Sequence, residues 1–276
     1  MKESNKDYLY HYTSIETLAL ILKNRTIRFN SLDKMDDLQE KEAEDIKNAG
    51  QFCYVSSWTE DVTESIPMWK MYATTDSGVR IGLRRNPFKL YENTVETLSK
   101  ITNMSVRTEE NAEALFSLIP VEEMFKKGFI CPMAMSQNIL HRVQYTQEYD
   151  KLYPKLVTIN GEQFTIALGE LGKYKNIHWE FQKEWRYMLL FFPLNFNQPI
   201  QTMSVEAQIM GNKILHGLEK QPFPYYDMTL DNEVFEDMEI TMCPQISEGN
   251  RIIIKSLVDK YNQKAIVKES SLKGLI

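Results

Sequence analysis

The densest group of chemically useful side chains lies in "EFQKEWRYMLLFF", where acidic, amide and basic residues precede an apolar run. The polar residues alternate with apolar ones, a spacing that in a strand places them on one face: Glu180, Gln182, Glu184 and Arg186. Such groups beside an apolar strand cost desolvation free energy unless they are paired or used. They predict either a Glu184–Arg186 or lysine–glutamate pair on the sheet surface, or a carboxylate at the edge of an aromatic cleft, where it stabilises a developing cation.

Three further stretches combine aromatic rings with polar groups. They are "YHYT" with His11, Tyr12 and Thr13, "CYVSSW" with Tyr54, Ser56 and Trp58, and "MWKMY" with Trp69 and Tyr72. Each also has an ordinary structural interpretation, because tryptophan and tyrosine supply large buried area with one polar handle. A lone histidine beside aromatic residues is more often a packing residue than a catalytic one.

The net charge of −6 argues against stable, non-specific binding of nucleic acid, which requires a basic excess or a basic stripe. The nearest approach to such a stripe is the short "LRRNPFK". The acidic run 36–45 is expected to be a solvated face. A brief visit to a nucleic-acid substrate stays compatible with this charge.

Three well-separated cysteines and four scattered histidines predict a reduced compartment and no structural metal site. The first residues, "MKESNKDYLY", lack an apolar signal core, and no stretch approaches the roughly 20 apolar residues of a membrane span. We therefore expect a soluble, cytoplasmic protein with no membrane partner.

These residues must be positioned by short strands and a few helices. The pattern predicts strands at 8–13, 25–31, 52–58, 78–83, 141–146, 184–192, 224–230, 235–241 and 265–270. Helices are expected at 14–24, begun by a Thr13–Glu16 capping box, at 161–174, and from Ser247 to about Tyr261.

The order of these elements is mixed, which favours an α+β fold over a doubly wound one. We expect a single domain over residues 1–276, with 91–175 as a mainly helical insertion or subdomain. Neither G-x-G-x-x-G nor G-x-x-x-x-G-K-[ST] occurs, so the common nucleotide-binding fingerprints are absent.

Taken together, these stretches resemble the bacterial domain-of-unknown-function 2971 family over nearly the whole chain. The matching positions are His11, Tyr12, Thr13, Asp37, Glu40, Ser56, Ser57, Trp58, Met68, Trp69, Tyr72, Ala73, Gly78, Gly82, Glu184 and Arg186. Two places depart from the family pattern. Asp36 and Leu38 replace the asparagine and proline of a turn, and Gln182 replaces the first glutamate of Glu-x-Glu.

A more remote similarity connects the chain with the ADP-ribosyltransferase superfamily, in its His-Tyr-Glu branch. It implies a mixed or antiparallel split sheet with flanking helices, NAD as substrate and no metal. It assigns catalytic roles to His11, Tyr54 and Glu184, which are expected to line one cleft, with His11 donating a hydrogen bond to a ribose hydroxyl. The binding residues that it implies are Tyr12, Thr13, Ser56, Trp58, Trp69, Tyr72, Gln182 and Arg186.

The activity implied by this resemblance is cleavage of the nicotinamide glycosidic bond and transfer of ADP-ribose to a protein or nucleic acid, in a toxin or phage-defence effector. A neutralising or regulatory partner protein is also implied. Two alternatives stay open, an NAD glycohydrolase and a non-catalytic ligand-binding or regulatory module on the same fold. Glu184→Gln is expected to abolish NAD turnover while leaving the stability close to that of the wild type.

Overall fold

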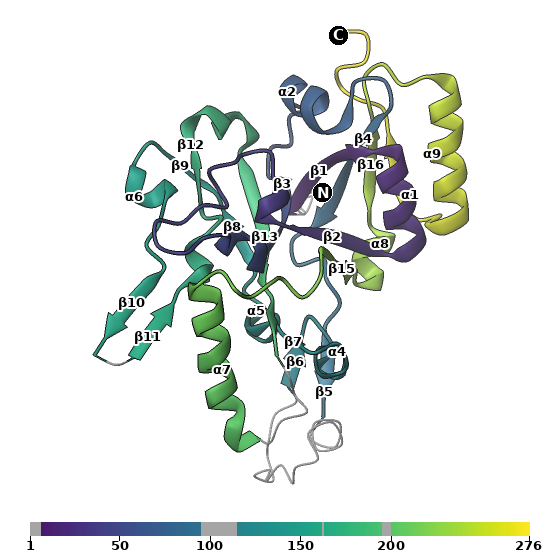
Figure 1. Cartoon of the computed structure of the whole chain (residues 1–276). Helices are drawn as coiled ribbons and strands as arrows, with labels where there is room; N and C mark the ends of the chain where they lie inside the picture. Colours follow the sequence, from purple (N-terminus) through teal and green to yellow (C-terminus); the bar gives the residue numbers. More distant parts are fainter. Residues whose placement is uncertain (1–6, 95–114, 162, 195–199) are drawn as a thin grey trace.

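A nine-stranded mixed sheet organises residues 7–94, 115–161, 163–194 and 200–276, which the computed structural model describes (Figure 1). The fold is mixed α+β, with helices flanking the sheet, as the mixed order of elements predicted. The order along the sheet is β15 (Tyr225–Thr229), β2 (Thr26–Ser31), β3 (Cys53–Thr59), β1 (Tyr8–Ser14), β4 (Gly78–Arg84), β16 (Glu239–Met242) and β17 (Ile266–Lys268). Strand β13 (Glu184–Leu190) also pairs with β3, and β8 (Leu140–Arg142) pairs with β13.

The sheet opens at the middle of β3. Its full length pairs with β13, from Cys53 to Thr59. In the described part of the chain, the ladders to β2 and β1 reach β3 only near its two ends, at Tyr54–Val55 and at Thr59. Residues 56–58 therefore present an edge without a neighbouring strand, and β1 and β2 diverge from this point.

Helix α1 (Ile15–Asn24) connects the two diverging strands. Ser14 is its N-cap, because its hydroxyl accepts a hydrogen bond from the backbone N–H of Thr17 at 3.1 Å. The cap predicted at Thr13 is thus wrong by one residue. The buried face of the helix carries Ile15, Leu18, Ile21 and Leu22. Arg25 ends it in the left-handed conformation.

Other helices are shorter, apart from α7 (Ile200–Leu215) and α9 (Glu248–Tyr261), whose predicted cap at Ser247 is confirmed. The short helices are α2 (Ile66–Met68), α4 (Val121–Lys127), α5 (Pro132–Ser136), α6 (Tyr149–Leu152) and α8 (Asn232–Glu236). Helical turns of other types are η1 (Leu32–Lys34), η2 (Ala49–Phe52), η3 (Trp69–Ala73), η4 (Leu168–Glu170) and η5 (Ile177–Gln182), of which η3 is a π-helix. None in the described residues is long and apolar enough to cross a membrane.

The range 91–175 is not mainly helical where the structure describes it; residues 95–114 lie outside the described residues. Its described residues contribute strands to four short two-stranded sheets: β5 (Tyr91–Asn93) with β6 (Leu115–Ser117), β7 (Phe129–Ile130) with β14 (Phe192–Pro193), β9 (Gln144–Thr146) with β12 (Tyr174–Asn176), and β10 (Val157–Asn160) with β11 (Gln163–Ile166). The helix predicted at 161–174 is therefore also wrong, because this stretch folds back on 157–160 as a hairpin.

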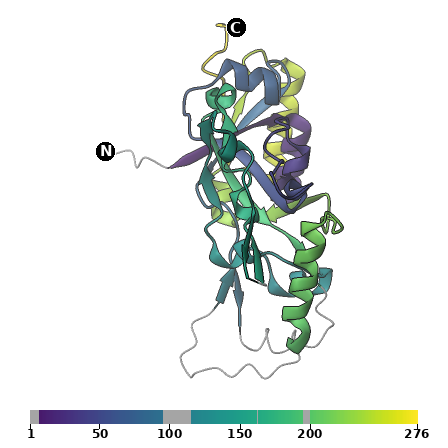
Figure 2. The same ribbon diagram turned by 60° about the vertical axis from the view of Figure 1, so that its left-hand side comes forward.

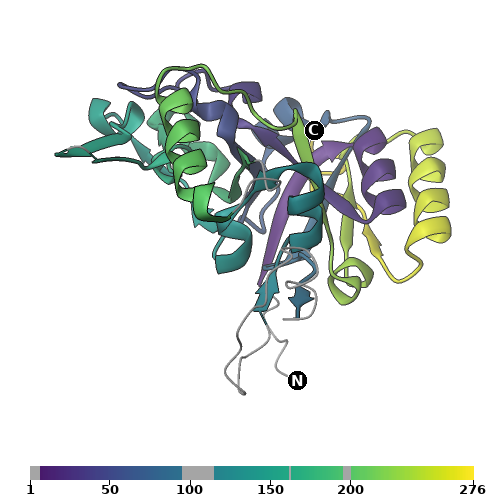
Figure 3. The same ribbon diagram turned by 60° about the horizontal axis from the view of Figure 1, so that its bottom comes forward.

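Three apolar clusters support the fold. The largest packs α1 and α9 against the main sheet, and Figures 1 and 3 show these two helices side by side at the β4 and β16 end. A second cluster lies around η2 and receives Ile214 of α7. Figure 2 shows α7 and the β5–β6 hairpin extending away from the main sheet. The third cluster is small and joins Tyr12, Trp69, Ala73 and Cys243.

Candidate functional site

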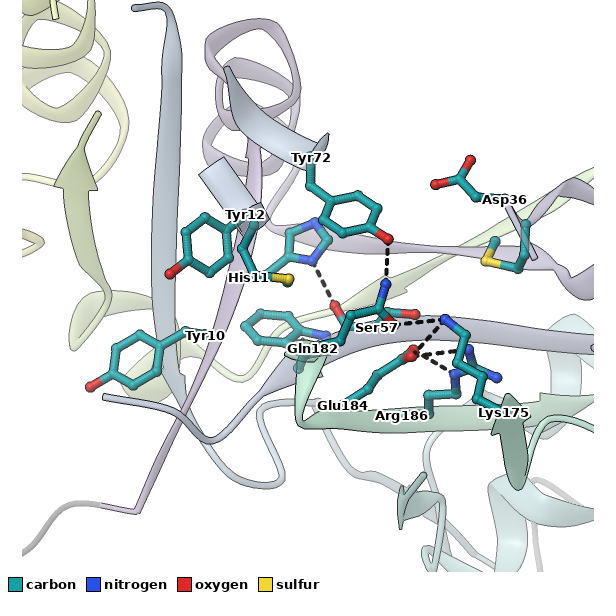
Figure 4. A pocket seen from close by; sticks show the side chains of 13 residues that line it. Tyr10, His11, Tyr12, Asp36, Ser57, Tyr72, Lys175, Gln182, Glu184 and Arg186 are labelled. Carbon is teal, nitrogen blue, oxygen red and sulfur yellow. Dashed lines mark hydrogen bonds and ion pairs between the residues drawn. The ribbon is translucent and has the colours of Figure 1, made fainter. Parts of the chain in front are cut away.

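A small pocket opens where β1 and β3 separate (Figure 4). Its volume is ≈ 90 Å³, room for a small ring, since one water needs about 10–15 Å³. It is lined by Tyr10, His11, Tyr12, Met35, Asp36, Ser57, Trp58, Met68, Tyr72, Lys175, Gln182, Glu184 and Arg186. The split in the sheet therefore creates a site between the first strand and the late strand β13.

A larger groove of ≈ 360 Å³ adjoins this pocket on the α1 side. Four residues, His11, Met35, Ser57 and Tyr72, line both spaces, which therefore lie next to each other. The lining of the groove is mostly apolar, and its hydroxyl and amide groups come from Thr13, Thr17, Asn24, Thr26, Asn30 and Ser56. Its two charged residues, Arg28 and Asp227, form a two-pronged ion pair at 2.8 and 2.9 Å.

Four buried charges form the base of the pocket, with side chains 1–7% exposed: Glu40, Lys175, Glu184 and Arg186. The Lys175 ammonium lies 2.9 Å from Glu40 and 3.0 Å from Oε2 of Glu184. Arg186 holds both oxygens of Glu184, through Nε at 2.5 Å and Nη2 at 3.1 Å, and also contacts Glu40. The two anions and two cations balance, which is how buried charges are tolerated.

Glu184 is held ionised by this cluster. Burial raises the pKa of its carboxyl, but the positive charges of Arg186 and Lys175 lower this pKa by more than burial raises it. The resulting pKa is about 2. The backbone N–H of Glu184 also donates to the Tyr145 hydroxyl at 2.8 Å. The pocket thus contains a fixed carboxylate that stays charged at any physiological pH.

His11 bridges the gap between β1 and β3. Its Nδ1 lies 2.8 Å from the carbonyl oxygen of Ser57, on the edge of β3 that has no strand partner. A carbonyl only accepts hydrogen bonds, so Nδ1 carries the proton. Burial lowers the pKa of His11, against the smaller, opposite effect of the Ser57 bond. The ring is therefore neutral, and its Nε2 is an acceptor rather than the donor that the resemblance implied.

Tyr72 and Gln182 meet across the pocket (Figure 4). The amide of Gln182 donates to the Tyr72 hydroxyl at 2.5 Å, and its oxygen accepts from Lys175 at 2.8 Å. Gln182 uses both ends of its amide in this way, as a donor to Tyr72 and as an acceptor from Lys175. It therefore links the aromatic wall to the charged base.

Most of the predicted residues share this site. His11, Glu184, Tyr12, Trp58, Tyr72, Gln182 and Arg186 line the pocket, while Thr13 and Ser56 line the groove. The rings of Tyr10 and Tyr12 point away from His11, because neighbouring side chains alternate along β1 (Figure 4). The indole of Trp58 instead lies 5.2 Å from the His11 ring, centre to centre.

Tyr54 and Trp69 are in neither space, and their predicted places in the cleft are wrong. Tyr54 pairs with Ser31 in the short ladder between β2 and β3. Its ring packs against Phe191 and Phe223. Its hydroxyl donates to the carbonyl of Phe223. Trp69 is fully buried in the third cluster behind the pocket wall.

The sequence predicted that Glu180, Gln182, Glu184 and Arg186 share one strand face, and only two of the four lie in a strand. Residues 177–182 form η5, and Lys183, in the left-handed conformation, ends it before β13 begins. Only Glu184 and Arg186 therefore share a strand face. Glu180 is exposed, and Gln182 reaches the pocket from the helical turn.

Sequence reasoning missed Lys175 and Glu40. Nothing in the sequence around Lys175 distinguishes it from a surface lysine, because its burial depends on contacts with residues distant along the chain. Glu40 had a signal, since it matches the turn motif of the resemblance, but it was assigned to the solvated acidic run. Asp37 and Glu40 are in fact buried.

Comparisons of the chain with protein-family models, with curated proteins and with solved structures found no match. The resemblance to the two families therefore stays a prediction. Among the described residues, no group of three or more histidine, cysteine or acidic side chains is placed to hold a metal ion.

Proposed function

We propose that this protein cleaves the nicotinamide glycosidic bond of NAD and transfers ADP-ribose to a macromolecule. The observation that carries the proposal is the meeting of His11 and Glu184 in one pocket, walled by Tyr72 and Trp58. His11, Trp58 and Glu184 come from three strands and Tyr72 from η3, and these side chains converge where the sheet opens.

The charge of the pocket suits this reaction. As the bond between C1′ and the ring nitrogen breaks, its electron pair leaves with nicotinamide and positive charge develops on the ribose. The four buried charges sum to zero, so Asp36, exposed at the rim, leaves the site with one net negative charge. A preorganised carboxylate such as Glu184 stabilises the developing cation without having to reorganise.

The two spaces match the two parts of the substrate. The pocket of ≈ 90 Å³ suits the nicotinamide ring, with Tyr72 and Trp58 as aromatic walls that favour a cationic ring. The groove of ≈ 360 Å³ takes the remaining nucleotide, and Nε2 of His11, between them, accepts a hydrogen bond from a ribose hydroxyl. The acceptor nucleophile then bonds to C1′ and loses its proton.

The diphosphate of NAD is held by neutral donors in this proposal. Every lysine or arginine that lines the two spaces, Arg28, Lys175 and Arg186, already has a carboxylate partner. Hydroxyl and amide groups of the groove are left for the phosphate oxygens. The affinity for NAD should therefore depend only weakly on salt.

The test compares two variants that keep the buried charges balanced. Glu184→Gln alone leaves a cation without its partner, a change that costs about 3–5 kcal/mol in buried pairs, so these contacts favour a loss of stability over the near wild-type stability expected from the sequence. Each of two double variants, Glu184→Gln/Lys175→Met and Glu40→Gln/Lys175→Met, removes one negative and one positive charge. Each leaves Arg186 paired with one carboxylate. Only the first removes the carboxylate that lines the pocket.

We expect the Glu184 double variant to release nicotinamide from NAD at least about 100-fold more slowly than the Glu40 double variant, at equal folded fraction. Equal rates in the two variants would contradict the catalytic role of Glu184. Wild-type protein that releases no nicotinamide would overturn the activity itself. NAD labelled in its adenylate part then separates the outcomes: label on a macromolecule indicates a transferase, and free ADP-ribose a glycohydrolase.

One observation favours a second candidate, a ligand-binding module without catalysis. Both oxygens of Glu184 are already engaged by Arg186 and Lys175, which limits what they offer to a ribose hydroxyl. Such a module would bind NAD and protect the protein against thermal unfolding, yet leave the NAD intact. The nicotinamide assay separates it from the enzyme.

A further inference from the structure

Glu64 connects the C-terminal segment, residues 270–276, to the wall of the pocket. Its carboxylate accepts hydrogen bonds from the Ser270 hydroxyl at 2.6 Å, and from the N–H and hydroxyl of Ser271 at 2.6 and 2.8 Å. It also accepts one from the indole N–H of Trp69 at 2.9 Å. Four donors thus satisfy one buried carboxylate, and two of the three residues that supply them belong to the C-terminal segment.

These contacts reach the pocket through η3. Trp69 is the first residue of this π-helix, and Tyr72, three residues later, is the aromatic wall. The Trp69 ring packs edge-on against Tyr12 at 5.0 Å, and the Tyr12 hydroxyl accepts from the N–H of Ser65. Figures 1 and 2 show the C-terminal end beside α2, which directly precedes η3.

The geometry of η3 has to be imposed by its surroundings. A π-helix is a rare conformation, frequent at functional sites. The next residue, Thr74, has φ 66° and ψ 152°, a region in which side chains are strained. Leu272 packs on the cluster that contains Trp69 and Ala73, so the C-terminal segment supplies apolar as well as polar support.

We propose that Glu64 is a positioning residue: by binding residues 270–271 and Trp69 together, it fixes η3 so that Tyr72 faces Gln182 and the ligand. The identity of the ligand rests on the proposed function, whereas the fixing of η3 does not. The expectation is that loosening the C-terminal segment weakens ligand binding from outside the pocket.

The experiment uses the full chain with Ser270→Ala/Ser271→Ala, which removes both hydroxyl donors to Glu64. The matched control is Lys273→Ala, in the same segment, whose ammonium contacts the exposed Glu269. Ser271→Thr keeps the hydroxyl and serves as the conservative variant. Amide hydrogen exchange of residues 66–73 and the Kd for NAD are measured under conditions where every variant is folded.

We expect the double variant to exchange the 66–73 amides about tenfold faster and to bind NAD about tenfold more weakly. Lys273→Ala and Ser271→Thr should resemble the wild type in both measurements. Unchanged exchange overturns the proposal, and so does faster exchange with an unchanged Kd. If the wild type binds no NAD, the proposed function fails, and the exchange rates alone decide whether Glu64 fixes η3.

Discussion

The neutral ring of His11 has a single nitrogen left for a ligand. Nδ1 donates to Ser57, so Nε2 is the nitrogen with a lone pair, and His11 lines both the pocket and the groove. An asparagine side chain can reproduce the Nδ1 donor but places nothing at the position of Nε2. An asparagine at this position therefore tests the role of Nε2 in ligand binding while keeping the hydrogen bond to Ser57.

His11→Asn is therefore expected to keep the free energy of unfolding within about 1 kcal/mol of the wild type, because the bond to Ser57 survives. The affinity for NAD should fall about tenfold, because one acceptor is lost. Calorimetric titration with NAD and urea unfolding measure the two effects. His11→Ala, as the control, loses both. Wild-type affinity in the asparagine variant would show that Nε2 does not contact the ligand.

At this scale, the sequence could identify the residue types of the site but not which of them face it. His11, Tyr72 and Glu184 were found because aromatic and ionisable residues clustered beside apolar runs. Tyr54 had the same pattern and is a core residue, since the partner of its ring, Phe223, is distant in the sequence. Lys175 could not be found because only tertiary contacts bury it.

Among the elements, η3 and β4 meet at an unusually close contact. A Cβ on Gly78 would lie 1.9 Å from the carbonyl oxygen of Ala73, the last residue of η3. Side chains never approach backbone so closely, so only glycine allows β4 to begin directly beside the π-helix. The position of Tyr72 thus depends on a residue that contacts no ligand.

Gly78→Ala should lower the free energy of unfolding by about 3 kcal/mol, because backbone must shift to admit the methyl group. Gly249→Ala is the matched control: it lies in α9, where the nearest atom is 4.0 Å away, and should stabilise the protein by about 0.5–1 kcal/mol. Urea unfolding of both variants gives the comparison. A Gly78 variant as stable as the control would contradict this account of the contact.

The sequence predicted the main strands β3, β4 and β13 well, because each carries aromatic or aliphatic residues that the sheet buries. The cap at Ser247 was equally readable. The range 91–175 was not, because its helices are short and its strands are two to four residues long. Such pieces carry too few turns for periodicity to decide, and their neighbours in space determine their conformation.

For the molecule as a whole, the buried charge cluster makes the free energy of unfolding depend on pH in the acidic range. The folded pKa of Glu184 is about 2, against an ordinary value of 4.5. Below 4.5 the unfolded chain takes up a proton that the folded protein refuses, so stability falls as the pH drops from about 4.5 to about 2. At higher pH this contribution is fully present.

We expect this one carboxylate to account for about 3 kcal/mol of acid sensitivity. The measurement is the free energy of unfolding in urea over a series of acidic pH values. Between about pH 4.5 and pH 2, Glu184→Gln/Lys175→Met should lose about 3 kcal/mol less unfolding free energy than Glu40→Gln/Lys175→Met, the reference protein that keeps Glu184. Parallel curves for the wild type and the Glu184 double variant would show that the cluster does not hold the carboxyl ionised.

The bond between Glu64 and residues 270–271 has a consequence for synthesis. A ribosome makes these residues after every residue that lines the pocket, so a nascent chain can fold its strands before its aromatic wall is held in place. On the function proposed above, ligand binding at full affinity would then follow only once residues 270–271 have been added to the chain and have bound Glu64.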